Sequence, residues 1–226
     1  MDSGNIKSYV IRNGRMSEAQ KRAYQNLSPS FCIKLKDKIE NYQTVFGNSN
    51  PVIIEIGFGS GNAIASLAEQ NPAINYLGIE VFRAGIGRLL WEIEKRGLNN
   101  IRIIEGDAVG IIRDFLPKNT ASAFHIFFPD PWPKKRHHKR RLVTRPFTLL
   151  LKDAMLPGAY IYMVTDWADY ADWAMTELSA TPGLSNQYEG FASGITWRPR
   201  TRFETKGLNK NHLISELYFK RVENEQ

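Results

Sequence analysis

The sequence predicts a single α/β domain built around a parallel β-sheet, and three observations lead to this prediction. Short runs of β-branched and aromatic residues alternate along the chain with longer amphipathic stretches, as strands alternate with helices in parallel α/β proteins. An acidic residue stands at the carboxyl end of four of the apolar runs, where ligands of such sheets bind. The chain has 226 residues, of which 42% are hydrophobic, and this is enough for one complete core.

In the first half of the chain, each predicted strand ends at a turn or an acid. These strands are Val52–Ile56 before Gly57, Tyr76–Ile79 before Glu80, and Ile101–Ile104 before Gly106 and Asp107. The amphipathic stretches around them predict the helices Leu35–Phe46, Asn62–Gln70, Arg83–Arg96 and Val109–Phe115.

In the second half, the predicted strand Ser122–Phe128 is ended by three prolines within five residues. Proline cannot continue a central strand, so Asp130 and Trp132, which alternate with these prolines, are expected on a stiff loop at the carboxyl end of the strand. The later patterns predict helix Arg145–Met155, strand Tyr160–Val164 before Asp166, helix Ala168–Leu178 and strand Leu213–Arg221.

Positive charge is concentrated directly after this loop. The segment from Lys134 to Arg145 contains seven lysines and arginines and no acidic residue, so it accounts for the whole formal net charge of +7. Such clustering favours a nucleic-acid partner over an evenly solvated basic face. His137 and His138 lie inside this basic run and are interpreted as solvated side chains close to phosphates, not as catalytic groups.

Residues 1–31 form a polar, basic N-terminal segment ahead of the domain at 32–226. Ser17 and Gln20 fit the start of a helix, and the segment is either a loosely docked leader or an ordered flap over an anionic ligand. It has no signal-peptide core, and no apolar run reaches membrane length, so we expect a cytoplasmic protein without a membrane partner. Cys32 is the only cysteine, which excludes an internal disulfide and a cysteine metal site; we expect no metal.

A glycine-rich turn, Gly57-Phe-Gly-Ser-Gly61, follows the first strand and lets the backbone approach a ligand closely. A dinucleotide fingerprint would require glycine at position 62, where this chain has Asn62. Glu80 follows Gly61 by nineteen residues at the end of the next strand, where its carboxylate can accept hydrogen bonds from both hydroxyls of a ribose. The pattern therefore favours S-adenosylmethionine, which has no pyrophosphate.

Two further acids fit the same cofactor. Glu55 lies two residues ahead of the glycine turn and can meet the positively charged amino end of the methionine moiety. Asp107 is placed to bond the adenine amino group, to cap the following helix, or to do both. With Asp130 and Asp166, these acids are expected to converge on one edge of the sheet.

Several segments together resemble the bacterial tRNA (guanine-N7)-methyltransferase family. They are the glycine turn with Glu55, Pro-Asp-Pro-Trp-Pro-Lys at 129–134, the basic run after it, Asp166-Trp167, and Arg198-Pro-Arg-Thr-Arg-Phe-Glu-Thr-Lys-Gly207. The resemblance covers nearly all of residues 30–222, and its proline-rich and Thr-x-Phe-Glu elements are specific. It implies a Rossmann-like class I methyltransferase with a mostly parallel, doubly wound sheet and an antiparallel last strand. The implied reaction moves a methyl group from S-adenosylmethionine to N7 of a guanosine in the variable loop of tRNA.

The resemblance also implies roles for individual residues. The cofactor-binding positions are Glu55, Gly57, Gly59, Gly61, Glu80, Asp107 and Asp130, and Asp130 is also the catalytic residue. The substrate-binding positions are Lys134, Asp166, Thr201, Arg202, Phe203 and Glu204, and the RNA-contacting positions are Arg136, His137, His138, Lys139, Arg140 and Arg141. Two positions depart from the family pattern: Arg202 replaces the usual lysine, which keeps the charge but not the geometry, and Ser60 replaces a bulkier residue.

The implied reaction requires mainly positioning from the protein. Guanine N7 has a lone pair and no proton, so neither a general base nor a metal is needed. Asp130, or Asp166 across the cleft, can accept hydrogen bonds from N1–H and the N2 amino group, and a carboxylate there also stabilises the cationic product. Trp132 and Phe203 are expected either to stack on the base or to pack in the core.

Two other functions are compatible with parts of the sequence. One is another S-adenosylmethionine-dependent methyltransferase, acting on a different RNA, a small molecule or a protein; the other is a non-catalytic RNA-binding module. The basic run disfavours a small-molecule or protein substrate, and the retained acids Glu55, Glu80 and Asp107 disfavour a non-catalytic module. The preferred tRNAs and the oligomeric state, monomer or homodimer, are left open by the sequence.

Overall fold

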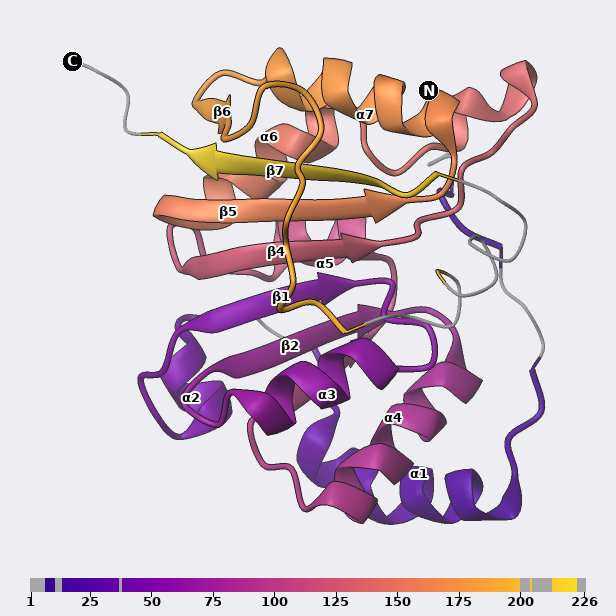
Figure 1. Ribbon diagram of the computed structural model, residues 1–226. Helices are drawn as coiled ribbons and strands as arrows, with labels where there is room; N and C mark the ends of the chain where they lie inside the picture. The colour runs from indigo at the N-terminus through magenta and orange to yellow at the C-terminus, as the bar shows by residue number, and fades with distance from the viewer. Residues whose placement is uncertain (1–6, 11–13, 37, 200–203, 205–212, 223–226) are drawn as a thin grey trace, which may run out of the picture.

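The computed structural model describes residues 7–10, 14–36, 38–199, 204 and 213–222. They form a seven-stranded sheet with strand order β3-β2-β1-β4-β5-β7-β6 (Figure 1). The strands are β1 (Val52–Ile56), β2 (Asn75–Glu80), β3 (Ile101–Glu105), β4 (Ala121–Phe127), β5 (Met155–Thr165), β6 (Leu184–Asn186) and β7 (Ser215–Arg221). β1 to β5 run parallel, and β7 lies antiparallel between β5 and β6. The predicted mostly parallel sheet with an antiparallel end is therefore confirmed.

Helices cover both faces of this sheet. They are α1 (Glu18–Phe31), α2 (Tyr42–Phe46), α3 (Asn62–Gln70), α4 (Arg83–Arg96), α5 (Ala108–Asp114), α6 (Arg145–Ala154) and α7 (Ala168–Ser179), with a 3₁₀ helix, η1, at Lys135–Arg140. α1, α3 and α4 pack into one hydrophobic core on one face, and α2, α5, α6 and α7 pack into a second core on the other. The central strands are buried on both sides, which is why β1 is nearly all apolar and does not alternate with polar residues.

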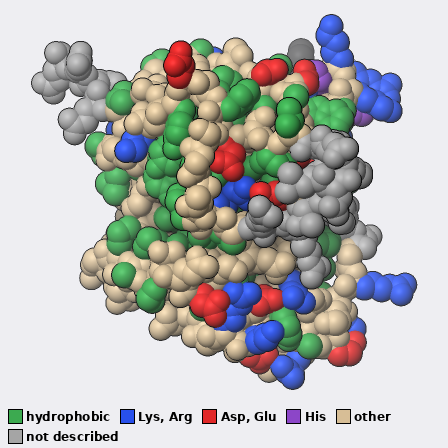
Figure 2. All heavy atoms as spheres, viewed as in Figure 1, with side chains coloured by type: hydrophobic (Ala, Val, Ile, Leu, Met, Phe, Trp, Pro, Cys, Tyr) green, Lys and Arg blue, Asp and Glu red, His purple; other side chains and the backbone are tan. Residues whose placement is uncertain are grey.

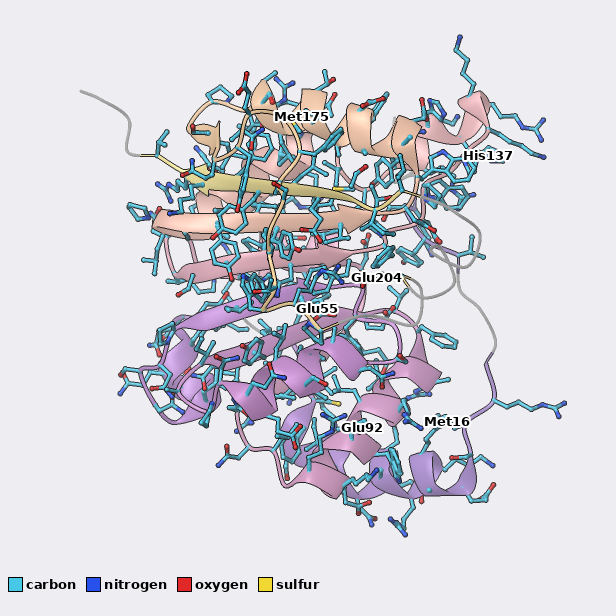
Figure 3. All side chains as sticks on the ribbon, viewed as in Figure 1. Met16, Glu55, Glu92, His137, Met175 and Glu204 are labelled. Carbon is cyan, nitrogen blue, oxygen red and sulfur yellow. The ribbon has the colours of Figure 1, made fainter. Side chains whose placement is uncertain are left out.

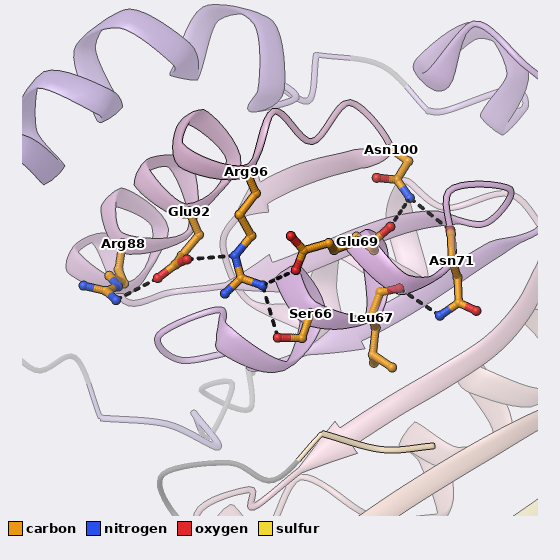
Figure 4. Close-up of polar contacts among 9 residues, drawn as sticks. Ser66, Leu67, Glu69, Asn71, Arg88, Glu92, Arg96 and Asn100 are labelled. Atoms are coloured by element: carbon orange, nitrogen blue, oxygen red, sulfur yellow. Dashed lines mark hydrogen bonds and ion pairs between the residues drawn. The ribbon is translucent and has the colours of Figure 1, made fainter. Parts of the chain in front are cut away.

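A polar network holds α3 against α4 (Figure 4). Glu92 of α4 is buried and accepts hydrogen bonds from Arg88 at 2.7 Å and from Arg96 at 3.0 Å. Arg96 also reaches across to Glu69 of α3 at 2.9 Å. The buried Glu92 carboxylate thus has two cationic partners, as a buried charge requires.

One part of the sheet is covered by an extended segment in place of a helix. Within the described residues, the chain after β6 crosses β7, β5 and β4 on the face that α3 and α4 cover elsewhere (Figure 1). Trp197 of this segment packs against His125 and Tyr162, with ring centroids 5.4 Å and 5.3 Å away. Ala192 donates a backbone hydrogen bond to Glu216 of β7 at 2.7 Å. Trp197 and the rings around it therefore cover β4 and β5 on this face of the sheet.

The helix predicted at Leu35–Phe46 is wrong for most of its length. Only Tyr42–Phe46 is helical, capped by Asn41 and ended by Gly47 in the left-handed conformation. The residues before it run past β3 and α5, because Ile33 donates to Ile103 at 2.8 Å and Ile39 donates to Phe115 at 2.8 Å. The short strand β6 and the 3₁₀ helix η1 were not predicted either.

The predicted helix start at Ser17 is confirmed. Ser17 and Gln20 form a reciprocal capping box at the start of α1. α1 then packs on α4, where Arg22 forms a 2.7 Å ion pair with Glu94. Among the helices that the structure describes, none combines the length and the apolar character needed to cross a membrane.

Candidate active site

A pocket of about 440 Å³ opens at the carboxyl ends of β1, β2, β3 and β4. Four of the five acids predicted at this edge line it: Glu55, Glu80, Asp107 and Asp130. The fifth, Asp166, follows β5 and is half-buried outside this lining. Parallel strands bring their carboxyl ends to one edge, so residues that are up to 75 positions apart meet here.

The glycine turn after β1 forms one wall of this pocket. Gly57, Gly59 and Gly61 have φ angles of 70°, 56° and 73°, a region that strongly favours glycine. At Gly61 a side chain is excluded on steric grounds as well, because a Cβ atom would lie 2.7 Å from the Cβ of Leu89 on α4. At these glycines the turn therefore presents backbone to the pocket, whose lining also includes Phe58 and Ser60.

Glu80 is oriented by three backbone donors. Its carboxylate accepts hydrogen bonds from Gly59 and Val81 at 2.7 Å and from Phe82 at 3.0 Å. Burial raises its pKa, and these hydrogen bonds oppose that shift. Each carboxylate oxygen has two lone pairs, so the side chain keeps acceptor capacity toward the pocket.

Glu55 is buried in the middle of the sheet, with 2% of its surface exposed (Figure 3). Its Oε2 atom has no hydrogen-bond partner among the residues that the structure describes. Burial and the nearby Glu80 carboxylate raise the pKa of Glu55 to about 8. A buried carboxyl with unused bonding capacity is suited to a cationic ligand group.

Of the two functions considered for Asp107, the structure shows the helix cap. It is the N-cap of α5 and accepts a hydrogen bond from the Val109 amide at 3.3 Å. It also lines the pocket. The capping function is observed, and it leaves a carboxylate oxygen for a ligand.

The loop that carries Asp130 has a strained backbone. Phe128 and Trp132 have φ angles of 53° and 47°, which large side chains rarely adopt. Such strain occurs where surrounding contacts hold a functional loop in one conformation. Trp132 makes such contacts: its indole N–H donates to the Ser8 carbonyl at 3.0 Å, and the Arg140 guanidinium lies 3.9 Å from its ring centroid. One face of the indole is thereby occupied.

The basic run folds into η1 and exposes only part of its charge. The exposed residues are Lys134, Lys135, Arg136 and Lys139. They form a group of basic side chains next to the histidines at one edge of the molecule (Figure 2), on the side where the parallel strands end (Figure 3). Arg140 is half-buried and donates to backbone carbonyls of Lys7 and Tyr9 at 3.0 Å and 3.3 Å.

The structure places Arg141 differently from the expected phosphate contact. Its side chain is buried, with 2% of the residue exposed. The guanidinium donates to the Pro131 carbonyl at 3.1 Å, pairs with Asp169, and lies 5.2 Å from the ring of Trp173. Arg141 therefore ties the Asp130 loop to α7 and does not face solvent.

Comparisons with known proteins agree with this geometry. A family described as "Putative methyltransferase" matches residues 49–217. The "tRNA (guanine-N(7)-)-methyltransferase" of Treponema pallidum (strain Nichols) is 43% identical over 240 residues, covering 95% of each chain. The same-named protein of Nitrosospira multiformis is 43% identical over 216 residues, covering 96% of this chain and 94% of its own. The chain belongs to the tRNA (guanine-N(7)-)-methyltransferase family.

Solved structures of more distant proteins support the fold. The structure titled "Crystal Structure of 16S rRNA Methyltranferase KamB" superposes with a TM-score of 0.61 at 12% identity, covering 84% of this chain and 97% of the other. At this identity the similarity concerns the fold alone, and it identifies the sheet as that of class I methyltransferases.

Glu204 is one of the substrate-binding residues that the family resemblance implies. Its side chain is buried and bound to Arg198. The two side chains form a bidentate pair with distances of 2.7 Å and 3.0 Å. Arg198 also donates to Glu216 and to the Tyr162 hydroxyl, both at 3.2 Å. The expected substrate residues Thr201, Arg202 and Phe203 lie outside the described residues.

Three features depend on tertiary contacts that the sequence does not specify residue by residue. Ser8, Tyr9 and Val10 line the pocket, which agrees with an ordered flap more than with a loosely docked leader. Arg198 binds Glu204, which follows it by six residues in the sequence. His125 lies beside Glu55 in the register of β1 and β4, where burial lowers its pKa to about 3 and keeps it neutral. Only the fold brings these residues close to the predicted site residues.

Proposed function

We propose that this chain transfers a methyl group from S-adenosylmethionine to N7 of a guanosine in the variable loop of tRNA. One observation carries the proposal: four acids line the pocket, and the loop that bears one of them, Asp130, leads directly into an exposed group of basic side chains. The acidic pocket suits a small cationic cofactor, and the basic surface suits a polyanionic substrate. A purely RNA-binding module would need only the second feature.

The side chains in the pocket fit S-adenosylmethionine, whose sulfonium supplies an activated methyl group. The Oε2 atom of Glu55 suits the ammonium of the methionine moiety, because it is buried and has no partner among the described residues. Glu80, held by three backbone donors, accepts from the ribose hydroxyls. Asp107 accepts from the adenine amino group with the acceptor capacity that capping α5 leaves.

Asp130 has the catalytic role in this proposal. N7 carries a lone pair and no proton, so Asp130 is not needed as a base. Its carboxylate accepts hydrogen bonds from guanine N1–H and the N2 amino group and so holds N7 in line with the methyl group. The same charge stabilises the positive charge that develops on the purine ring. Phe128 and Trp132, both with left-handed backbones, flank Asp130, and the contacts of Trp132 with Ser8 and Arg140 hold this loop before the substrate binds.

The substrate is held mainly through its phosphates. Lys134, Lys135, Arg136 and Lys139 are exposed and directly follow the loop that carries Asp130. Contacts of this kind fix the position of the RNA without reading its sequence. Asp166, which follows β5, and Glu204, which pairs with Arg198, are the other side chains that we assign to binding the guanosine.

An experiment with unmodified tRNA transcript and cofactor carrying a labelled methyl group tests the proposal. We expect the label in N7-methylguanosine at one position of the variable loop after digestion of the tRNA. A transcript with adenosine at that position serves as the matched control and should stay unlabelled. Label in a different base, or label retained in the control, would overturn the assignment.

A further inference from the structure

The described residues 7–10, here called the N-terminal strap, belong to no helix or strand, and Ser8, Tyr9 and Val10 among them line the pocket. Among the described residues, three side-chain hydrogen bonds hold the strap, and all three come from Trp132 and Arg140. Trp132 donates from its indole to Ser8 at 3.0 Å, and Arg140 donates to Lys7 and Tyr9 at 3.0 Å and 3.3 Å. All three acceptors are backbone carbonyls, so these bonds depend on the path of the strap and not on its side chains.

The two donors are fixed relative to each other. The Arg140 guanidinium lies 3.9 Å from the Trp132 ring centroid, a cation–π arrangement, and His137 packs edge-on against the same indole at 5.9 Å. Trp132 keeps a left-handed backbone, which persists only where surrounding contacts hold it. The donors are therefore preorganised, and the strap is the part that they position.

The strap lies at the side of the pocket where Asp107 follows β3. Ser8, Tyr9 and Val10 line the pocket together with Asp107. Burial and the nearby Asp107 carboxylate raise the pKa of the Tyr9 hydroxyl, which agrees with a position beside that residue. An aromatic side chain at this place suits an adenine ring, which has an extended apolar face.

We propose that Trp132 and Arg140 are positioning residues for the cofactor, because they hold the N-terminal strap as the wall against which the adenosyl group packs. This inference rests on the proposed S-adenosylmethionine function. It also divides the basic run by role. Lys135, Arg136 and Lys139 attract RNA, whereas Arg140 uses two of its five N–H donors on the strap.

Calorimetric titration of S-adenosylmethionine in the absence of RNA tests the proposal. Trp132→Phe keeps an aromatic ring beneath Arg140 but lacks the N–H that bonds Ser8. Arg140→Lys keeps the positive charge but cannot donate to two carbonyls in the same planar geometry. We expect each variant to bind the cofactor ~3- to 10-fold more weakly, the scale of one missing hydrogen bond. Lys139→Ala, an exposed neighbour in η1, is the matched control and should keep the wild-type affinity.

Hydrogen exchange distinguishes positioning from a general loss of stability. Amides of residues 7–10 should exchange faster in both variants, while those of β1, β4 and β5 keep their wild-type protection. Wild-type affinity in both variants would overturn the inference, and so would faster exchange throughout the sheet. Failure of the wild-type protein to bind S-adenosylmethionine would instead reject the proposed cofactor, so the two outcomes can be told apart.

Discussion

At the scale of single residues, the site depends on carboxylates that differ in their surroundings. Glu80 accepts three backbone hydrogen bonds, Asp107 caps a helix, Glu55 is buried with an unpartnered oxygen among the described residues, and Asp130 lies on a strained loop. Identical functional groups therefore have different tasks, as the environment of each carboxyl sets its charge and its bonding capacity.

The variant Asp130→Asn separates charge from shape at the loop. Asparagine keeps the size but exchanges one acceptor for a donor and removes the charge. We expect the single-turnover methylation rate to fall by ~10²-fold or more, the effect of removing one transition-state interaction. tRNA affinity should hardly change because phosphate contacts dominate it. Asp172→Asn, an exposed substitution on α7, is the charge-matched control. A wild-type rate in Asp130→Asn would contradict the assignment and make Asp166 the candidate for the catalytic residue.

The raised pKa of Glu55 predicts that cofactor binding releases a proton. The pKa of Glu55 is about 8, so at pH 7 its carboxyl is mostly neutral, whereas pairing with the ammonium of the cofactor requires the ionised form. Calorimetry at pH 7 in buffers of different ionisation enthalpy should reveal the release of about one proton per cofactor. Glu55→Gln should remove this buffer dependence and weaken binding. An unchanged buffer dependence in Glu55→Gln would assign the proton to another group.

At the scale of elements, the predicted helices and strands match the structure where the local sequence signals are strong. Val52–Ile56, Asn62–Gln70 and Arg83–Arg96 were predicted with the bounds that the structure has, because each couples a clear period to a glycine or an acid near one of its ends. Leu35–Phe46 failed since its apolar residues serve two purposes, an extended path past β3 and then a helix. The cap Asn41 and the terminal Gly47 are the residues that mark the true helix in the sequence.

The helix η1 and the buried arginine after it predict two separable defects. Replacing Lys135, Arg136 and Lys139 with alanine should weaken tRNA binding and reduce its salt dependence. The log–log slope should fall by about 0.9 for each duplex phosphate that the protein no longer neutralises. Unfolding free energy should be nearly unchanged, since these side chains are exposed. tRNA binding measured at several salt concentrations provides the test, and an unaltered slope would show that η1 does not contact phosphates.

Arg141→Met should have the opposite profile. It removes the bond to the Pro131 carbonyl and the pair with Asp169, while keeping an apolar stem among Tyr170 and Trp173. We expect a loss of about 1–3 kcal/mol in unfolding free energy, measured by urea denaturation. The salt slope of tRNA binding should match the wild type. A reduced salt slope together with a wild-type unfolding free energy would instead show that Arg141 contacts phosphate.

At the scale of the whole molecule, the topology explains which part of the site was predictable. Acids at strand ends meet because the sheet is parallel, so Glu55, Glu80, Asp107 and Asp130 could be assigned to one pocket from the sequence. The contact between Trp132 and Ser8 joins residues 124 positions apart, and the burial of Arg141 depends on α7 packing behind the loop. Such contacts depend on tertiary packing, which no local pattern encodes.

Two buried ionisable groups give the ligand-free protein a specific dependence of stability on pH. Glu55 binds a proton up to about pH 8 when folded but only to its ordinary range near 4.5 when unfolded, so it makes unfolding free energy fall as pH rises between these values. His125, whose folded pKa is about 3, acts oppositely between 3 and 6.5. Above pH 6.5 only Glu55 of this pair remains effective.

We therefore expect wild-type protein to lose up to ~2 kcal/mol of unfolding free energy relative to Glu55→Gln between pH 6.5 and pH 8, at about 1.4 kcal/mol per pH unit. Urea denaturation without cofactor at several pH values measures this difference. Parallel pH profiles for the two proteins would mean that Glu55 is already ionised in the folded state.

The uneven placement of charge makes the molecule an electric dipole. The lysines and arginines from 134 to 145 equal the entire formal excess of +7, and the exposed ones protrude at a single corner beside the pocket. In the field of a polyanion such a body experiences a torque as well as an attraction. We therefore expect an approaching tRNA to turn the protein during diffusion, so that the corner next to Asp130 faces the RNA before any base is contacted.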